Sequence, residues 1–248
     1  ITIAGAAGCG QGEHRTEIVV FAASSLAESL KEIRTNFEAL HPESRLLFHL
    51  AGSQQLRTQI ELGATADVYI SADAQMVSDL VEMQLLKGET ANFAKNRVQV
   101  LIAPGNPGGI ESLADLAKPG KRLVMGVAEV PIGAATREVL GLLERSPRYG
   151  PQFVDHLLAN IISEEMNVRG VIARLALGEA DAAFAYESDS YTKAAQGMTS
   201  ITLPQNLAVE VQYAAGALFE GKDGFPPMLI RFLNSEVSKR ILRAHGLI

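Results

Sequence analysis

The stretch that decides the fold is Glu17-Ile18-Val19-Val20-Phe21-Ala22-Ala23-Ser24-Ser25-Leu26-Ala27-Glu28-Ser29-Leu30. Its β-branched and small residues predict a buried strand, and the apolar residues that recur from Leu26 to Leu40 predict one face of a helix. Two serine hydroxyls therefore lie where a strand leads into a helix N-terminus. Free backbone N–H groups and the positive end of the helix dipole make such a place an anion site. Ala51-Gly52-Ser53 stands before a second expected helix in the same way.

Strand and helix patterns alternate along most of the chain, which predicts an α/β fold with largely parallel sheets. The expected strands are 17–23, 44–50, 66–70, 98–104, 123–128, 161–163, 182–186 and 209–218, and the expected helices are 26–40, 54–62, 74–86, 131–144, 167–178 and 226–245. The strand 209–218 leads back to the first block. We therefore expect a discontinuous lobe I (17–97 plus 212–248), a lobe II (98–211), a cleft between them, and a tail over 1–16.

Composition and motifs exclude several classes of function. The net charge is −6, so the chain lacks the basic patch of a nucleic-acid-binding protein. No Gly-x-Ser-x-Gly elbow, phosphate-binding glycine loop or zinc-ligand spacing occurs in the sequence. We expect no enzyme activity and no cofactor.

The single cysteine, Cys9, follows Ala6-Ala7-Gly8 in a short apolar segment. This resembles the end of a bacterial lipoprotein signal, where the cysteine becomes lipid-modified, although Ala6 stands where that signal usually has leucine. The alternative is a tail left by a trimmed signal peptide.

Each candidate site residue also has an ordinary structural interpretation. Ser25 with Glu28 fits a capping box, and Ser53 fits an N-cap. Tyr186, at the end of an expected strand, fits a half-buried aromatic residue whose hydroxyl bonds a backbone group. In doubly wound folds, however, the carboxyl ends of the strands are where ligands bind.

The motifs, taken in order, resemble the periplasmic molybdate-binding proteins of bacterial ABC importers, from Glu17 to the C-terminus. The resemblance is carried by the segments 21–26, 51–53, 59–73, 130–133, 167–170 and 178–189. It implies the type II periplasmic-binding-protein fold, in which each of two lobes is a mostly parallel sheet flanked by helices. The ligand, a tetrahedral oxyanion, then lies in the cleft between the lobes.

The resemblance also implies the ligand residues. They are the hydroxyls of Ser25 and Ser53, backbone N–H groups around Ile132 and Val168, and the hydroxyl of Tyr186, which we expect at the rim of the site, within reach of water. Molybdenum would be present only as the oxyanion, with no protein ligand to the metal. Ser24 stands where the family usually has alanine, so Ser24 remains an alternative ligand. Ile132 replaces a smaller residue, and its side chain is expected to narrow the pocket.

These implications predict a monomeric extracytoplasmic protein that captures molybdate or tungstate and delivers it to a membrane permease with its cytoplasmic ATPase. We expect it in the periplasm or at the cell surface, with Cys9 as the candidate lipid anchor. The alternatives are the same fold with another oxyanion such as sulfate, or with a small organic anion. The effector-sensing half of a transcription regulator would need a helix-turn-helix segment, and none fits before Glu17. An enzyme would need a catalytic group in the cleft, where the matching positions offer only neutral donors.

Overall fold

The computed structural model describes residues 15–219 and 221–248, so Cys9 lies outside the described residues. The strands are β1 (Thr16–Ala23), β2 (Ser44–Ala51), β3 (Val68–Ser71), β4 (Thr90–Ile102), β5 (Leu123–Gly126), β6 (Ile161–Glu165), β7 (Ala182–Tyr186), β8 (Thr199–Thr202) and β9 (Glu210–Ala217). The helices are α1 (Ala27–Leu40), α2 (Ser53–Glu61), α3 (Ala74–Glu82), α4 (Pro131–Glu144), α5 (Pro151–Ala159), α6 (Val168–Ala176), α7 (Phe225–Leu233) and α8 (Glu236–Ala244).

The strands are hydrogen-bonded in the order β2-β1-β3-β9-β4-β7-β5-β6, with β8 beside β4. β1 runs parallel to β2 and β3, and β5 runs parallel to β6 and β7. The long strands β4 and β9 are antiparallel to their neighbours. β4 pairs with β9 as far as Arg97 and with β7 from Val98 onward. β4 and β9 thus join a first half of the molecule, which holds β1–β3, to a second half, which holds β5–β8.

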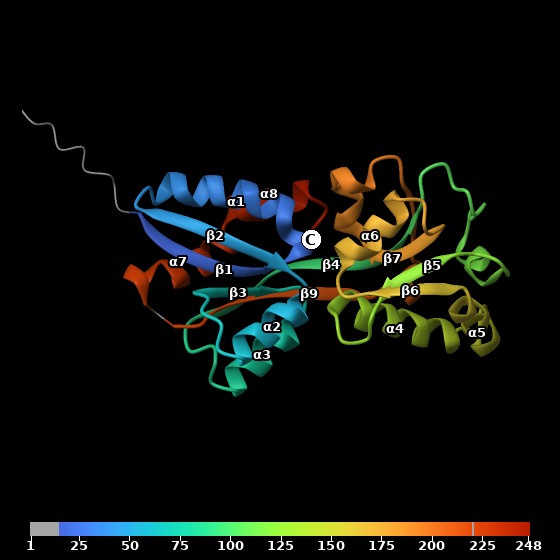
Figure 1. The fold of residues 1–248 in the computed structure, drawn as a ribbon, viewed down its shortest axis with the longest axis horizontal. Coiled ribbons are helices and arrows are strands. Elements are labelled where there is room, and N and C mark those ends of the chain that lie inside the picture. Colours follow the sequence, from blue (N-terminus) through green and yellow to red (C-terminus); the bar gives the residue numbers. More distant parts are fainter. Residues whose placement is uncertain (1–14, 220) are drawn as a thin grey trace, which may run out of the picture.

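Helices cover both faces of the sheet in the first half (Figure 1). The side chains of β1 alternate between the faces, as the pleat of a strand requires. Ile18 and Val20 pack with the apolar faces of α1, α7 and α8, whereas Phe21 packs with α2 and α3. The expected strand and helix at the start of the chain are therefore confirmed, and the carboxyl end of β1 points to the middle of the molecule.

The second half has its own core, formed by β5, β7, α4, α5 and α6. α4 begins at Pro131, which suits the first turn because its fixed φ is already helical. α6 begins after Asn167, whose side chain accepts a hydrogen bond from the backbone N–H of Gly170 at 3.0 Å. Both helix starts lie where the sequence predicts them. Val211 in β9 packs against the cores of both halves.

Two expectations about the elements were wrong, and two elements, α5 and β8, were not predicted. The C-terminal helix is two helices, α7 and α8, because Ser235 caps the second by accepting from the Ser238 N–H. The strand expected from residue 98 begins at Thr90. Within the described part of the chain, none of the helices combines the length and apolar character needed to cross a bilayer.

Candidate functional site

The starts of α1, α2, α4 and α6 surround a small cavity between the two halves. Its volume is about 20 Å³, slightly more than the ~10–15 Å³ that one water molecule needs by the same measure. All the sequence-predicted site residues that the structure describes meet there, Ser24 included. The lining residues are Ala23, Ser24, Ser25, Ala51, Gly52, Ser53, Ala72, Val130, Pro131, Ile132, Asn167, Val168 and Tyr186.

Ser25 lies in a single 3₁₀ turn, Ser24–Leu26, between β1 and α1. Its Oγ lies 2.9 Å from the hydroxyl oxygen of Tyr213 in β9. The capping box with Glu28 does not form, because the start of α1 has no side-chain cap and Glu28 bonds Lys31 at 2.8 Å. The Ser25 side chain is therefore not used to cap its own helix.

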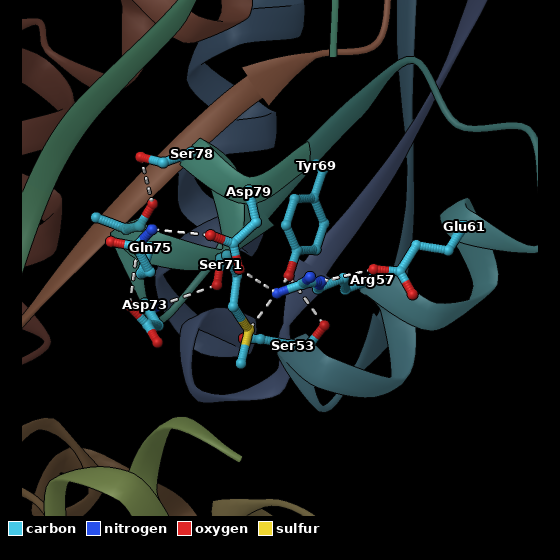
Figure 2. Close-up of polar contacts among 11 residues, drawn as sticks. Ser53, Arg57, Glu61, Tyr69, Ser71, Asp73, Gln75, Ser78 and Asp79 are labelled. Carbon is cyan, nitrogen blue, oxygen red and sulfur yellow. Dashed lines mark hydrogen bonds and ion pairs between the residues drawn. The ribbon is translucent and has the colours of Figure 1, made fainter. Parts of the chain in front are cut away.

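Ser53 is the first residue of α2, and Gly52 occupies the N-cap position without a side-chain cap. The Ser53 Oγ accepts a hydrogen bond from the Ala72 N–H at 3.1 Å, and the Tyr69 hydroxyl donates to the Ser53 carbonyl at 2.9 Å. Figure 2 shows Tyr69 directed at the start of α2. The Ser53 Oγ accepts this hydrogen bond, and no acceptor for its own proton occurs among the described residues, so the proton is available to the cavity. The N-cap interpretation of Ser53 is wrong.

Backbone N–H groups of the second half complete the lining. Pro131 has no N–H, so the first donor of α4 is Ile132, and Val168 is the first residue of α6. Gly133 allows α4 to start this close to the preceding loop, because a Cβ there would lie 1.7 Å from the Val127 carbonyl oxygen. Helix starts from both halves thus direct free donors and dipole ends at one cavity.

The Tyr186 hydroxyl is buried and has no hydrogen-bond partner among the described residues. The residue is 1% exposed, so the expected position at a water-accessible rim was wrong, as was a bond to the backbone. Burial raises the pKa of Tyr186 well above its ordinary value, and the phenol stays neutral. A neutral hydroxyl without a partner is a donor available to a ligand.

Of the residues that the structure describes, none with a charged side chain lines the cavity. The guanidinium of Arg169 lies beside it and spans the two halves: its Nε donates to the Ser24 carbonyl at 2.8 Å, and its Nη2 lies 3.6 Å from a Glu28 carboxylate oxygen. Asp189 follows Tyr186, accepts a hydrogen bond from the Tyr186 N–H at 2.8 Å, and has its pKa raised to about 7 by burial. Among the described residues, no cluster of His, Cys, Asp or Glu could hold a metal ion.

Sequence reasoning missed the supporting roles of Tyr213, Asn96 and Arg169. Tyr213 and Asn96 belong to no motif, and Arg169 lies in the segment 167–170 but was not assigned a role. Tyr213 lies 188 positions from its partner Ser25. No periodicity or local spacing links residues so far apart. Only the pairing of β9 with β4 and β3 could have placed Tyr213 beneath the cavity.

The sequence profile of the family described as "Bacterial extracellular solute-binding protein" matches residues 18–248. The molybdate-binding protein ModA of Mycobacterium tuberculosis (strain ATCC 25618 / H37Rv) is 34% identical over 230 residues, which cover 92% of this chain and 83% of that protein. Two solved structures share the fold. The periplasmic molybdate-binding protein of Azotobacter vinelandii has a TM-score of 0.78 at 21% identity and covers 93% of this chain and 98% of its own. The sulfate-binding protein SubI from Mycobacterium tuberculosis H37Rv has a TM-score of 0.79 at 17% identity, and the match covers 94% of this chain and 86% of that chain.

Proposed function

The chain belongs to the family of bacterial extracellular solute-binding proteins, and from that premise we propose that it captures molybdate and tungstate for an ABC importer. Members of this family bind solutes rather than convert them, so the chain is a binding protein and not an enzyme. The observation that carries the choice of ligand is the unpartnered Tyr186 hydroxyl, buried in a small uncharged cavity with Ser25 and Ser53.

A site built from donors alone suits a fully deprotonated oxyanion. The hydroxyls of Ser25, Ser53 and Tyr186 and the N–H groups of Ile132 and Val168 would each donate to a molybdate oxygen. Hydrogen bonds to a charged group contribute roughly 1.5–3 kcal/mol each. Phosphate carries a proton at neutral pH, and this proton would face donors with no acceptor, which opposes its binding.

Ligand size separates the remaining candidates. Cavities that hold organic ligands measure roughly 300–1,000 Å³, whereas this cavity measures about 20 Å³. In this closed arrangement the cavity is too small for an organic ligand of that size, and the lining would have to move apart slightly even for a five-atom oxyanion. Sulfate has the right charge and shape but is smaller than molybdate, so donors spaced for molybdate would not all reach it. Tungstate matches molybdate in charge and nearly in size, and we expect it to bind with similar affinity.

Membership of the solute-binding family supports a wider role in transport. We propose that the loaded protein, a monomer, delivers its anion to a membrane permease driven by a cytoplasmic ATPase. Ala6-Ala7-Gly8-Cys9 supports lipid attachment at Cys9, which would hold the protein at the membrane surface. No cofactor is needed, because the charge of the anion is balanced by neutral donors and helix dipoles.

Isothermal titration with molybdate, tungstate, sulfate and phosphate tests this proposal. We expect molybdate and tungstate to bind at least a hundredfold more tightly than sulfate, a difference of about 2.7 kcal/mol. Sulfate binding that equals or exceeds molybdate binding would overturn the choice of ligand. It would leave the assignment to the solute-binding family intact.

A further inference from the structure

We infer that Tyr213 and Asn96 are positioning residues that commit the Ser25 hydroxyl to donating into the cavity. The inference rests on the proposed capture of a deprotonated oxyanion. It concerns side chains that do not line the cavity themselves, since both lie on the strands that join the two halves, Asn96 on β4 and Tyr213 on β9.

Asn96, Tyr213 and Ser25 form a continuous chain of hydrogen bonds that runs from the buried strands to the half-buried Ser25. The Asn96 Nδ2 lies 2.8 Å from the Ser188 Oγ and 3.3 Å from the Tyr213 hydroxyl oxygen. The Tyr213 hydroxyl oxygen lies 2.9 Å from the Ser25 Oγ. Asn96 and Tyr213 are both fully buried, so water does not interrupt the chain beneath Ser25.

The direction of this chain is set at Asn96. Its Oδ1 accepts from the backbone N–H groups of Arg97 at 3.0 Å and Ser188 at 3.4 Å. The amide group must therefore present its Nδ2, which can only donate, to Tyr213. The Tyr213 oxygen consequently accepts from Asn96 and keeps its own proton for another partner.

The Tyr213 proton has one acceptor within reach among the described residues, the Ser25 Oγ. Buried hydroxyl protons are almost always hydrogen-bonded, so Tyr213 donates to Ser25. The Ser25 proton is then left for the cavity that the residue lines. Hydrogen bonds arranged in series polarise one another, which makes the Ser25 hydroxyl a stronger donor. Because one lone pair of the Ser25 oxygen is occupied, the hydroxyl is also a poorer acceptor for a protonated anion.

Tyr213 also contacts the site from its other side. Its ring packs edge-on against the ring of Tyr186, with centroids 6.4 Å apart, and against Phe93 at 6.3 Å. Tyr213→Phe removes the hydroxyl and keeps both ring contacts. The variant therefore isolates the proposed donation to Ser25 from the packing role of the side chain.

The test is a double-mutant cycle measured by titration with molybdate. Tyr213→Phe should weaken binding roughly five- to tenfold. In the Ser25→Ala background the same substitution should change the dissociation constant less than about twofold, since Tyr213 acts through Ser25. Tyr69→Phe is the matched control: it also removes a fully buried tyrosine hydroxyl, but one bonded to the Ser53 carbonyl. Its effect should add to that of Ser25→Ala.

A second readout separates positioning from a general structural effect. The affinity for phosphate relative to that for molybdate should rise in Tyr213→Phe, because the Ser25 oxygen becomes free to accept a hydrogen bond from the phosphate O–H. Additive effects in the cycle together with an unchanged molybdate-to-phosphate ratio would overturn the inference. If thermal unfolding without ligand shows that Tyr213→Phe does not fold, Asn96→Ala replaces it in the cycle with the same expected non-additivity.

The wild-type titration distinguishes this inference from the proposed function. If the wild type binds sulfate and not molybdate, the choice of ligand fails, and the cycle is measured with sulfate, which is equally deprotonated. Non-additivity would then still support the positioning role, and additivity would overturn it. A wild type that binds none of these anions overturns both.

Discussion

At the scale of single residues, the Tyr186 hydroxyl is expected to affect stability and ligand binding in opposite directions. Burying a hydroxyl without a partner costs about 1–3 kcal/mol, and the closed arrangement of the two halves carries this cost at Tyr186. Tyr186→Phe should therefore leave the free energy of unfolding unchanged or raise it, while weakening molybdate binding by roughly 1.5–3 kcal/mol. Denaturant unfolding and titration of the same preparation measure the two effects. A destabilised variant with unchanged affinity would show that the hydroxyl serves the fold.

The two adjacent serines differ in their surroundings, although both line the cavity. The Ser25 Oγ bonds Tyr213, whereas Ser24 is held through its backbone carbonyl, which accepts from Arg169. We expect Ser25→Ala to weaken molybdate binding by roughly 1.5–3 kcal/mol and Ser24→Ala to change it little. Titration of both variants is the measurement. A large loss at Ser24 with none at Ser25 would place the ligand serine one position earlier.

Asp189, which bonds the Tyr186 N–H, should make the free energy of unfolding depend on pH. Burial raises its pKa to about 7 in the folded protein, against about 3.9 in an unfolded chain. The folded state thus holds a proton that the unfolded state has lost, so the free energy of unfolding falls as the pH rises through this interval. Between pH 5 and pH 8 the wild type should lose roughly 2–3 kcal/mol more than Asp189→Asn, which keeps an oxygen for the Tyr186 N–H. The free energy of unfolding of both proteins is measured in denaturant at each pH. If it changes with pH equally in the wild type and in Asp189→Asn, the raised pKa of Asp189 is contradicted.

At the scale of elements, the start of α4 depends on one glycine. A Cβ on Gly133 would lie 1.7 Å from the Val127 carbonyl oxygen and 2.6 Å from that of Gly126. Gly133→Ala must therefore move the helix start, and we expect a loss of more than ~3 kcal/mol in the free energy of unfolding together with weaker anion binding. Denaturant unfolding and titration are the measurements.

Gly141, on the same helix, provides the control. A Cβ there would lie 3.4 Å from the end of the flexible Arg145 side chain, and alanine favours a helix by roughly 0.5–1 kcal/mol over glycine. Gly141→Ala should therefore be neutral or stabilising and leave binding unchanged. If Gly133→Ala and Gly141→Ala change stability and binding equally, the close approach of Gly133 to the Val127 carbonyl oxygen does not determine where α4 starts.

The elements that sequence patterns predicted are those with local signals. Pro131 marks the start of α4 and Asn167 that of α6, and the structure begins both helices there. The break between α7 and α8 was missed because apolar residues continue across it, although Ser235 is an ordinary N-cap residue. The first part of β4 was missed because polar and apolar residues mix there. Its partner β9 lies more than a hundred positions away along the chain.

Within the site, too, features with a local sequence signal could be predicted and features that depend on distant strands could not. The site residues lie at strand ends or helix starts: Ser25, Ser53, Ile132, Val168 and Tyr186. β1 of the first half, which is parallel to β3, and β5 and β7 of the second half, which are parallel to each other, bring their carboxyl ends to the cavity. Their convergence could thus be predicted from the sequence. The hydrogen bonds that orient the serine hydroxyls could not, because they depend on how distant strands register.

At the scale of the whole molecule, the cavity exists because the two halves touch. Arg169 of α6 bonds the Ser24 carbonyl of the first half, and donors from both halves line the space. An anion that contacts both sets stabilises this closed arrangement over an open one. We therefore predict movement of lobe I against lobe II at Arg97–Val98 and Gln212–Tyr213, the points where β4 and β9 pass between them.

Gly52 is where this closure can be tested. A Cβ there would lie 2.8 Å from the Met166 carbonyl oxygen, across the interface between the halves. Its backbone has φ −64° and ψ 139°, which alanine adopts without strain. Gly52→Ala should therefore fold normally and resist closing, with molybdate affinity reduced roughly 5- to 150-fold by a clash of the order of 1–3 kcal/mol.

Small-angle scattering measures the closure directly. The wild type should show a smaller radius of gyration with molybdate than without it, and Gly52→Ala should contract less at saturating molybdate. Gly170→Ala is the matched control, because the nearest atoms to its Cβ would all belong to Glu165 of the same half, the first at 3.2 Å, so the contraction should stay intact. If the wild type binds tightly with an unchanged radius, the free protein is already closed. In that case Gly52→Ala should weaken binding by expanding the free protein, which the scattering of the ligand-free variant would reveal as a radius larger than that of the wild type.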